Sequence, residues 1–134
     1  MRLFEYQAKQ IFRENGIPVP GSRLIQKKND IPQDFFPSLF KAQILSGGRG
    51  KLGGIRTVHN YLQAEEVFSE LMAFNVHGEL TQSILAEEKI DFEREYYLSF
   101  VIDKQKNVPI FLLSHSGGVE IEDTAKNAKH QKKN

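Results

Sequence analysis

The sequence predicts a mixed α+β protein. Two segments carry apolar residues at helical spacing, and six short runs rich in β-branched and aromatic residues have the length and composition of strands. A glycine-rich stretch separates two of these runs. The order along the chain is helix, strands, helix, strands, and no internal repeat is visible. We therefore expect one mixed arrangement within 134 residues, about the size of one domain.

The first helix is expected over Leu3–Asn15, with Gly16 well placed to end it and Pro18 just beyond. A short strand is expected over 21–26 (GSRLIQ). Segment 30–40 (DIPQDFFPSLF) contains two prolines, so we expect it to be irregular and partly a loop. One face of the first helix carries four apolar side chains: Phe4, Ala8, Ile11 and Phe12.

Two strands are expected at 38–45 (SLFKAQIL) and 54–59 (GIRTVH), on either side of the glycine-rich stretch. A second helix should run from Tyr61 to about Phe74, because Asn60 and Gln63 form a capping-box pattern at its start. The residues that this helix is expected to bury are Val67, Phe68 and Leu71, with Phe74 as a further candidate.

Three more strands are expected at 82–88 (QSILAEE), 94–103 (REYYLSFVID) and 107–116 (NVPIFLLSHS). The last two should pair as a hairpin around DKQKN. The chain then ends in a hydrophilic tail, 126–134, which we expect to be disordered.

The composition excludes several classes of site. The chain has no cysteine, which rules out disulfides and thiolate metal sites. No apolar run is long enough to cross a bilayer, and the N-terminus lacks the apolar stretch of a signal peptide. We therefore expect a cytoplasmic protein that does not bind membranes, or a mature chain whose targeting segment is missing. The net charge of +1 gives no argument for a nucleic-acid partner.

The stretch SGGRGKLGG, Ser46–Gly54, is typical of loops that bind phosphate. Glycine permits positive φ and lets backbone N–H groups approach an anion without a Cβ in the way. Arg49 and Lys51 add positive charge. The alternative is a flexible hairpin tip that carries two solvated cations, since G-x-G-x-x-G alone is a weak signal.

The surrounding residues exclude two common phosphate-binding loops. A Walker A loop requires glycine where Leu45 stands and Ser or Thr where Leu52 stands. A Rossmann loop leads directly into a helix, whereas the strand-like IRTVHN follows here. What remains is a flap between two antiparallel strands, an arrangement that protein kinases also use, although this chain has neither H-R-D nor D-F-G.

Two further groups of residues suggest nucleotide contacts. Lys41 lies seven residues before Gly48, on the strand that enters the flap, where an ammonium group can reach phosphates. Its alternative role is a solubilising lysine on an edge strand. Glu87 and Glu88 end an apolar strand, and Glu95 begins the next, so these carboxylates are candidates for ribose hydroxyls at a hinge. Their alternative role is an ordinary acidic turn.

Four ordered segments together resemble the β subunits of succinyl-CoA synthetase, also called succinate–CoA ligase. They are FEYQAKQIFRENGIPVP, KAQILSGGRGKLGGIRTV, ILAEEKIDFEREYYLSFVID and SHSGGVEIED. The resemblance runs from Met1 to about Ala125. It implies the N-terminal part of an ATP-grasp fold over residues 1–125.

The resemblance also implies roles for individual residues. Lys41 would contact nucleotide phosphates, and Gly48, Arg49 and Gly50 would form the phosphate-covering loop. Glu87 would lie at the adenine and ribose hinge. The nucleotide site would be completed by two more residues, Ile90 through its backbone and Glu95 through a ribose hydroxyl.

The family reaction joins succinate to coenzyme A with ATP or GTP, in the tricarboxylic acid cycle, through a phosphohistidine on a partner α subunit. No catalytic or metal-binding residue is assigned in this chain, because the resemblance implies that the Mg²⁺ ligands lie outside it. We therefore expect a truncated β subunit that is inactive as a ligase when alone, with exposed apolar surface in NVPIFLLSHS.

Two alternatives stay open at this level. The chain could be a non-catalytic nucleotide-binding or interaction module derived from an acid–CoA ligase, of the malate–CoA ligase, ATP-citrate lyase or ADP-forming acetyl-CoA synthetase type. It could also be a small structural domain without a ligand.

Overall fold

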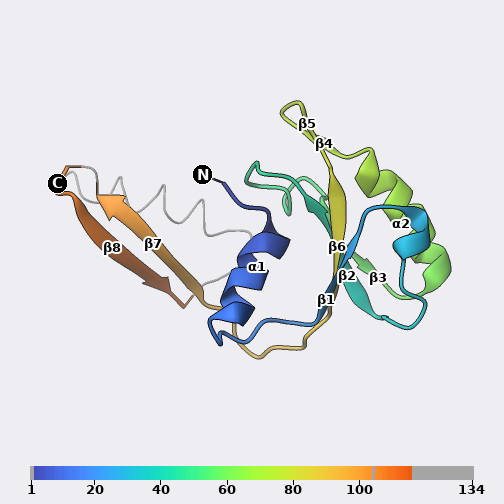
Figure 1. Cartoon of the computed structure of the whole chain (residues 1–134), viewed down its shortest axis with the longest axis horizontal. Coiled ribbons are helices and arrows are strands. Elements are labelled where there is room, and N and C mark those ends of the chain that lie inside the picture. The colour runs from blue at the N-terminus through green and yellow to red at the C-terminus, as the bar shows by residue number, and fades with distance from the viewer. Residues whose placement is uncertain (1, 104, 116–134) are drawn as a thin grey trace. The chain divides into compact units, whose positions relative to one another are not determined.

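The computed structural model describes residues 2–103 and 105–115 and divides the chain into two compact units between Ile90 and Asp91 (Figure 1). The tail expected at 126–134 lies outside the described residues. The first unit contains, in chain order, α1 (Glu5–Glu14), β1 (Ser22–Ile25), the short 3₁₀ helix η1 (Lys28–Asp30), β2 (Ser38–Gln43), β3 (Ile55–Val58), α2 (Tyr61–Met72), β4 (Asn75–Val76), β5 (Glu79–Leu80) and β6 (Ser83–Glu88).

The centre of the first unit is an antiparallel sheet in the order β1-β6-β2-β3. Strand β2 is therefore an inner strand, and Lys41 in it pairs with Leu85 of β6 on one side and with Ile55 of β3 on the other. Figure 1 shows α1 and α2 on opposite sides of this sheet. The two faces of β2 and β6 consequently meet different helices.

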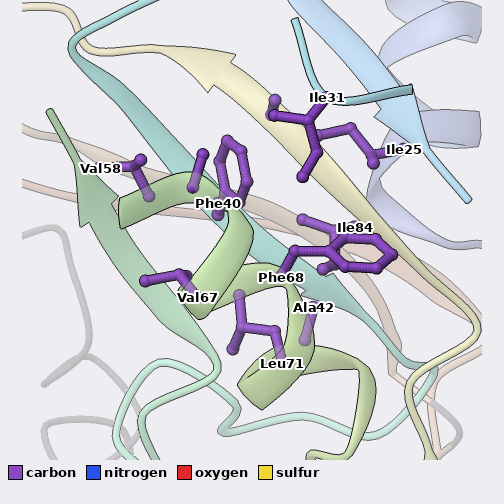
Figure 2. Packing of buried hydrophobic residues seen from close by; sticks show 11 residues of the cluster. Ile25, Ile31, Phe40, Ala42, Val58, Val67, Phe68, Leu71 and Ile84 are labelled. Atoms are coloured by element: carbon purple, nitrogen blue, oxygen red, sulfur yellow. The ribbon is translucent and has the colours of Figure 1, made fainter. Parts of the chain in front are cut away.

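The face toward α2 forms the hydrophobic core (Figure 2). Phe40 and Ala42 of β2 and Ile84 of β6 are completely buried there. Burying apolar side chains of this size is the main source of stability in a small domain. Helix α2 buries the three residues expected from its spacing, Val67, Phe68 and Leu71, together with Ala64, while Phe74 packs partly buried at the margin.

The face toward α1 carries charged and polar side chains together with the buried Leu85. Because side chains alternate along a strand, Lys41 and Gln43 of β2 lie on the opposite face from Phe40. The backbone N–H of Tyr6 in α1 donates to Gln43 Oε1 at 3.2 Å. The apolar face expected for this helix is not buried among the described residues, since Ile11 and Phe12 are 45% and 46% exposed.

The ends of both helices follow from local residues. The Asn60 side chain accepts a hydrogen bond from the Gln63 backbone N–H at 3.0 Å, as a residue at this helix start should. The Gln63 side chain reaches back to the backbone N–H of His59 at 2.9 Å, one residue earlier than a standard capping box. Gly16, which follows α1, has φ +74°, the left-handed conformation that ends helices.

The described part of the second unit is the expected hairpin of β7 (Tyr97–Asp103) and β8 (Val108–Ser114). Asp103 Oδ1 accepts hydrogen bonds from two backbone N–H groups of the turn. Phe100 and Phe111 face each other across the strands, with ring centroids 4.9 Å apart. Several large apolar side chains of this hairpin are exposed, as expected for NVPIFLLSHS.

Sequence patterns did not predict the small hairpin β4–β5. It contains two residues in each strand, and its turn is formed by His77 and Gly78, which have φ values of 52° and 88°. Strands this short lack the alternation that identifies longer ones.

Candidate functional site

The glycine-rich loop joins β2 to β3, which are antiparallel neighbours, so the expected flap is confirmed. Two backbone hydrogen bonds close its base: Ala42 N–H donates to the Gly54 carbonyl and Gly54 N–H donates to the Arg49 carbonyl, both at 2.8 Å. Gly48 and Gly53 have φ values of +81° and +88°, which side chains with a Cβ rarely adopt. The loop therefore depends on glycine for its shape.

Glu79, from the short strand β5, holds the first residues of this loop. Its Oε2 accepts hydrogen bonds from Ser46 N–H at 2.9 Å and from Ser46 Oγ at 2.6 Å. Its Oε1 accepts from Leu45 N–H. The hydroxyl of Ser46 and then the N–H of Leu45 lower the pKa of Glu79 below its ordinary value. The carboxylate therefore stays charged at neutral pH and fixes the entry to the loop.

Replacing Glu79 with glutamine is expected to speed amide hydrogen exchange at Leu45 and Ser46, because an amide supplies one acceptor and no charge. Exchange at Ala42, whose N–H bonds to Gly54, should stay unchanged and serves as the internal control. In the wild-type chain the lowered pKa keeps the contribution of this carboxylate in full above pH ~4.5. That contribution is lost as the pH falls through the lowered folded-state value. Equal exchange rates in the two proteins would contradict the role given to Glu79.

Arg49 turns inward from the loop and binds at two points. Its Nη1 donates to the Ala42 carbonyl at 2.9 Å, and its Nη2 pairs with Glu5 Oε2 of α1. The side chain is 16% exposed, and burial lowers the pKa of the guanidinium from its ordinary value. The alternative of a loop tip with two solvated cations is therefore wrong for Arg49.

Lys41 lies between two carboxylates. Its Nζ is 2.5 Å from Glu87 Oε1 of β6 and 3.0 Å from Glu5 Oε1 of α1. Only 13% of the Lys41 side chain is exposed, and burial lowers its pKa, while a hydrogen bond with Lys9 acts in the opposite direction. An inner strand and this degree of burial exclude the edge-strand role for Lys41.

Lys9 of α1 completes the cluster. Its Nζ is 3.0 Å from Glu5 Oε1, the atom that Lys41 also contacts, and it pairs with Glu87 Oε2. We call Glu5, Lys9, Lys41, Arg49 and Glu87 the charge cluster. Burial first, and then the positive charge of Lys41, lower the pKa of Lys9 to about 7.

The structure brings together three of the predicted site residues, Lys41, Arg49 and Glu87, while Gly48 and Gly50 lie in the loop beside them. Ile90 is 48% exposed and lies in the segment that follows β6. Glu95 is exposed and belongs to the second unit.

The two adjacent carboxylates at the end of β6 differ in their surroundings. Glu87 is buried, with a side chain 6% exposed, whereas Glu88 is exposed at the end of the strand. An ordinary acidic turn does not describe Glu87, because a turn carboxylate is solvated and this one is paired with two lysines.

Three residues of the site were not found from the sequence: Glu5, Lys9 and Glu79. The spacing of Glu5 and Lys9, four residues apart on a helix, is a signal that they share a face. That spacing does not predict which face of the sheet the two side chains contact. Glu79 gives no local signal, because the loop that it binds lies 33 residues earlier.

Within residues 2–103 and 105–115 no three His, Asp or Glu side chains gather as a metal site would require. None of the helices in the described ranges has the length and apolar character of a membrane span.

Comparison with known proteins places the chain in a family. Residues 2–132 match the model of the ATP-grasp domain. A β subunit of ADP-forming succinate–CoA ligase from Methanocaldococcus jannaschii is 43% identical over 127 residues, which cover 93% of this chain and 35% of that protein. The subunit SqwK of an ADP-forming sulfoacetate–CoA ligase from Acholeplasma is 42% identical, over 93% of this chain and 31% of that protein. The chain thus spans about a third of the length of these relatives.

Solved structures agree in fold. A crystal structure of PH1788 from Pyrococcus horikoshii has a TM-score of 0.71 at 18% identity, covering 90% of this chain and 55% of that one. A dinucleotide-forming acetyl-coenzyme A synthetase from Ca. Korarchaeum cryptofilum, solved with coenzyme A, acetyl-coenzyme A and a phosphorylated phosphohistidine segment, has a TM-score of 0.66 at 21% identity. It covers 87% of this chain and 53% of that one. With a glycine flap between antiparallel strands and a match over nearly every residue, the chain belongs to the ATP-grasp family, and its relatives include the β subunits of succinate–CoA ligase.

Proposed function

We propose that this chain binds the phosphates of a nucleoside di- or triphosphate between the glycine flap and the charge cluster. The observation that carries the proposal is the convergence of Lys41 and Arg49, which come from β2 and from the flap and share the carboxylate of Glu5. Both cations are held within hydrogen-bonding distance of an anion before any ligand arrives. Charged hydrogen bonds to phosphate are stronger than neutral ones, and arginine offers a planar fork that matches phosphate oxygens.

We also propose contacts to the adenine and the ribose. Strand β6 ends at Glu88, and the segment after it carries Ile90, whose backbone we propose as the contact to the base. Glu87 and Glu95 are the proposed carboxylates for the hinge and for a ribose hydroxyl. Glu87 is already paired with Lys41, so a hydroxyl bound there would adjoin the phosphate-binding lysine.

The reaction that this site serves is, in our proposal, the ADP-forming ligation of an acid to coenzyme A. The full activity needs a partner α subunit with the phosphohistidine, and Mg²⁺ at ligands outside the described residues, so the chain alone should not turn over. Succinate is the acid named for the subunit from Methanocaldococcus jannaschii, but a sulfoacetate–CoA ligase subunit is almost as similar. The identities therefore do not separate one acid from another. A cytoplasmic location remains an expectation.

The alternative is a non-catalytic nucleotide-binding module derived from an acid–CoA ligase. It needs the same convergence of Lys41 and Arg49 on Glu5 and no partner chain. The ligase and the non-catalytic module require the same phosphate site. They differ in one expected result: only for the ligase should adding the α subunit and the rest of a β subunit restore succinate- and coenzyme A-dependent use of ATP.

The phosphate site is tested by calorimetric titration of the full chain with ADP, GDP and adenosine. ADP should bind more tightly than adenosine, and Lys41→Met or Arg49→Met should each weaken ADP binding by about 10- to 100-fold, the range for one charged hydrogen bond. Adenosine binding should change little in either variant.

The matched control is Lys28→Met. Lys28 also belongs to the first unit and pairs with a carboxylate, Glu65, at 3.1 Å, but it is 55% exposed and its partner lies on α2. This variant should bind ADP as the wild type does. A wild-type chain that binds ADP no better than adenosine would show that the cluster does not recognise phosphate.

A further inference from the structure

The charge cluster contains more cations than the proposed phosphate contacts account for. Lys41 and Arg49 carry two positive charges, and Glu5 and Glu87 carry two negative ones. These four groups alone would be neutral and would attract an anion weakly. Lys9, whose pKa is lowered to about 7, adds a third positive charge within the same network when it is protonated.

The position of Lys9 duplicates that of Lys41. Both ammonium groups lie 3.0 Å from Glu5 Oε1, and they pair with the two different oxygens of Glu87. Each carboxylate therefore keeps a cationic partner if Lys41 turns toward a ligand. This matters because a buried carboxylate that loses its only partner carries a large desolvation cost.

We propose that Lys9 is the third cation of the phosphate site, which neutralises Glu5 and Glu87 while Lys41 and Arg49 bind the nucleotide phosphates. The inference rests on the proposed function. Lys9 is a positioning residue here, since it acts on the phosphates through the carboxylates that it shares with Lys41.

The electrostatics of the charge cluster are consistent with this role. The groups that face Lys9 are Glu5 and Arg13 from its own helix, Lys41 from β2 and Glu87 from β6. Burial and the charge of Lys41 lower the pKa of Lys9 to about 7, even though two carboxylates contact it. The charge cluster thus holds positive charge at a cost, and an added anion would relieve that cost.

A purely structural ion pair predicts a different result from a phosphate-site cation. If Lys9 only holds α1 against the sheet, its loss affects every ligand of the folded chain equally. If Lys9 serves the phosphates, its loss affects ADP and spares adenosine. The ratio of the two affinities therefore separates the roles, and it is insensitive to the fraction of chain that is folded.

The experiment titrates ADP and adenosine into the wild-type chain, Lys9→Met, Lys9→Arg and the control Lys28→Met. Circular dichroism on each confirms that the variant is folded. We expect Lys9→Met to lower the ratio of ADP affinity to adenosine affinity by about three- to tenfold, the scale of one charge acting through a carboxylate near the surface. Lys9→Arg should restore most of the ratio, and Lys28→Met should leave it unchanged.

An unchanged ratio in Lys9→Met, with Lys41→Met still defective, would overturn the role of Lys9 and leave the proposed function standing. A wild-type ratio of one would overturn the proposed function, and the inference with it. If Lys9→Met does not fold, the ratio of ADP affinity to adenosine affinity is compared between Lys9→Arg and Lys9→Gln instead. The positive charge of arginine must then preserve the ratio and the neutral amide must lower it.

Discussion

Replacing Glu87 with alanine is expected to lower the free energy of unfolding by about 3–5 kcal/mol, the usual cost of removing one partner from a buried ion pair. The Glu87 side chain is 6% exposed, and each of its oxygens pairs with a lysine. Its removal leaves Lys9 and Lys41 close together with Glu5 as their remaining shared carboxylate. Urea denaturation followed by circular dichroism measures the change as a lower midpoint at unchanged slope.

The neighbouring Glu88→Ala is the control, because Glu88 is exposed at the end of the same strand. Its effect should stay within about 0.5 kcal/mol, as for most surface substitutions. Adding Lys9→Met to Glu87→Ala should recover part of the loss, since it removes one of the two cations left facing each other. Equal losses in the Glu87 and Glu88 single variants would show that the charge cluster contributes no more to stability than a surface carboxylate.

Replacing Gly54 with alanine is expected to destabilise the chain by about 1–3 kcal/mol, the cost of overpacking a filled site, and to weaken ADP binding. A Cβ at this position would lie 2.7 Å from Cε1 of Phe74 and 3.0 Å from the carbonyl oxygen of Arg49. Phe74 packs against the core, and the Arg49 carbonyl accepts the Gly54 N–H, so neither atom can move freely.

The paired readout for Gly54→Ala is a thermal unfolding curve and an ADP titration. Adding Phe74→Leu should recover stability, because it removes the ring atoms nearest the new methyl group. It should not recover ADP affinity in full, because the contact with the Arg49 backbone persists. Wild-type ADP affinity in the single variant would mean that the position of Arg49 does not depend on the packing of Gly54.

The flap and the two cations Lys41 and Arg49 could be predicted from the sequence, because all of them lie in one short stretch of the chain. A glycine-rich loop between two β-branched runs excludes the helix that a Rossmann loop needs, and β3 does follow it. Lys41 and Arg49 both lie within that same local pattern. The partners of these cations could not be found in this way, because Glu5 precedes Lys41 by 36 residues and Glu87 follows it by 46. Those contacts depend on β6 inserting between β1 and β2.

The amphipathic spacing of helix α1 predicts the helix but not the residues that it packs against. The spacing of Phe4, Ala8, Ile11 and Phe12 correctly predicted a helix, which runs from Glu5 to Glu14. The same spacing did not identify what the helix packs against, and the face of the sheet that meets α1 carries Lys41, Gln43 and Glu87. The helix therefore meets the sheet through its Glu5 and Lys9 side chains, and Ile11 and Phe12 stay half exposed.

The alternation of β2 and β6 has a consequence for how faithfully the sheet assembles. Phe40 and Ile84 face α2 while Lys41 and Glu87 face α1, and the two strands pair Phe40 with Ala86 and Lys41 with Leu85. A slip of one residue in either strand would turn an ionised side chain into the apolar core and the side chain of Phe40 or Ile84 toward α1. The same charges that we propose for phosphate recognition therefore help to specify the strand register during folding. Only the correct pairing places every buried charge beside an opposite charge.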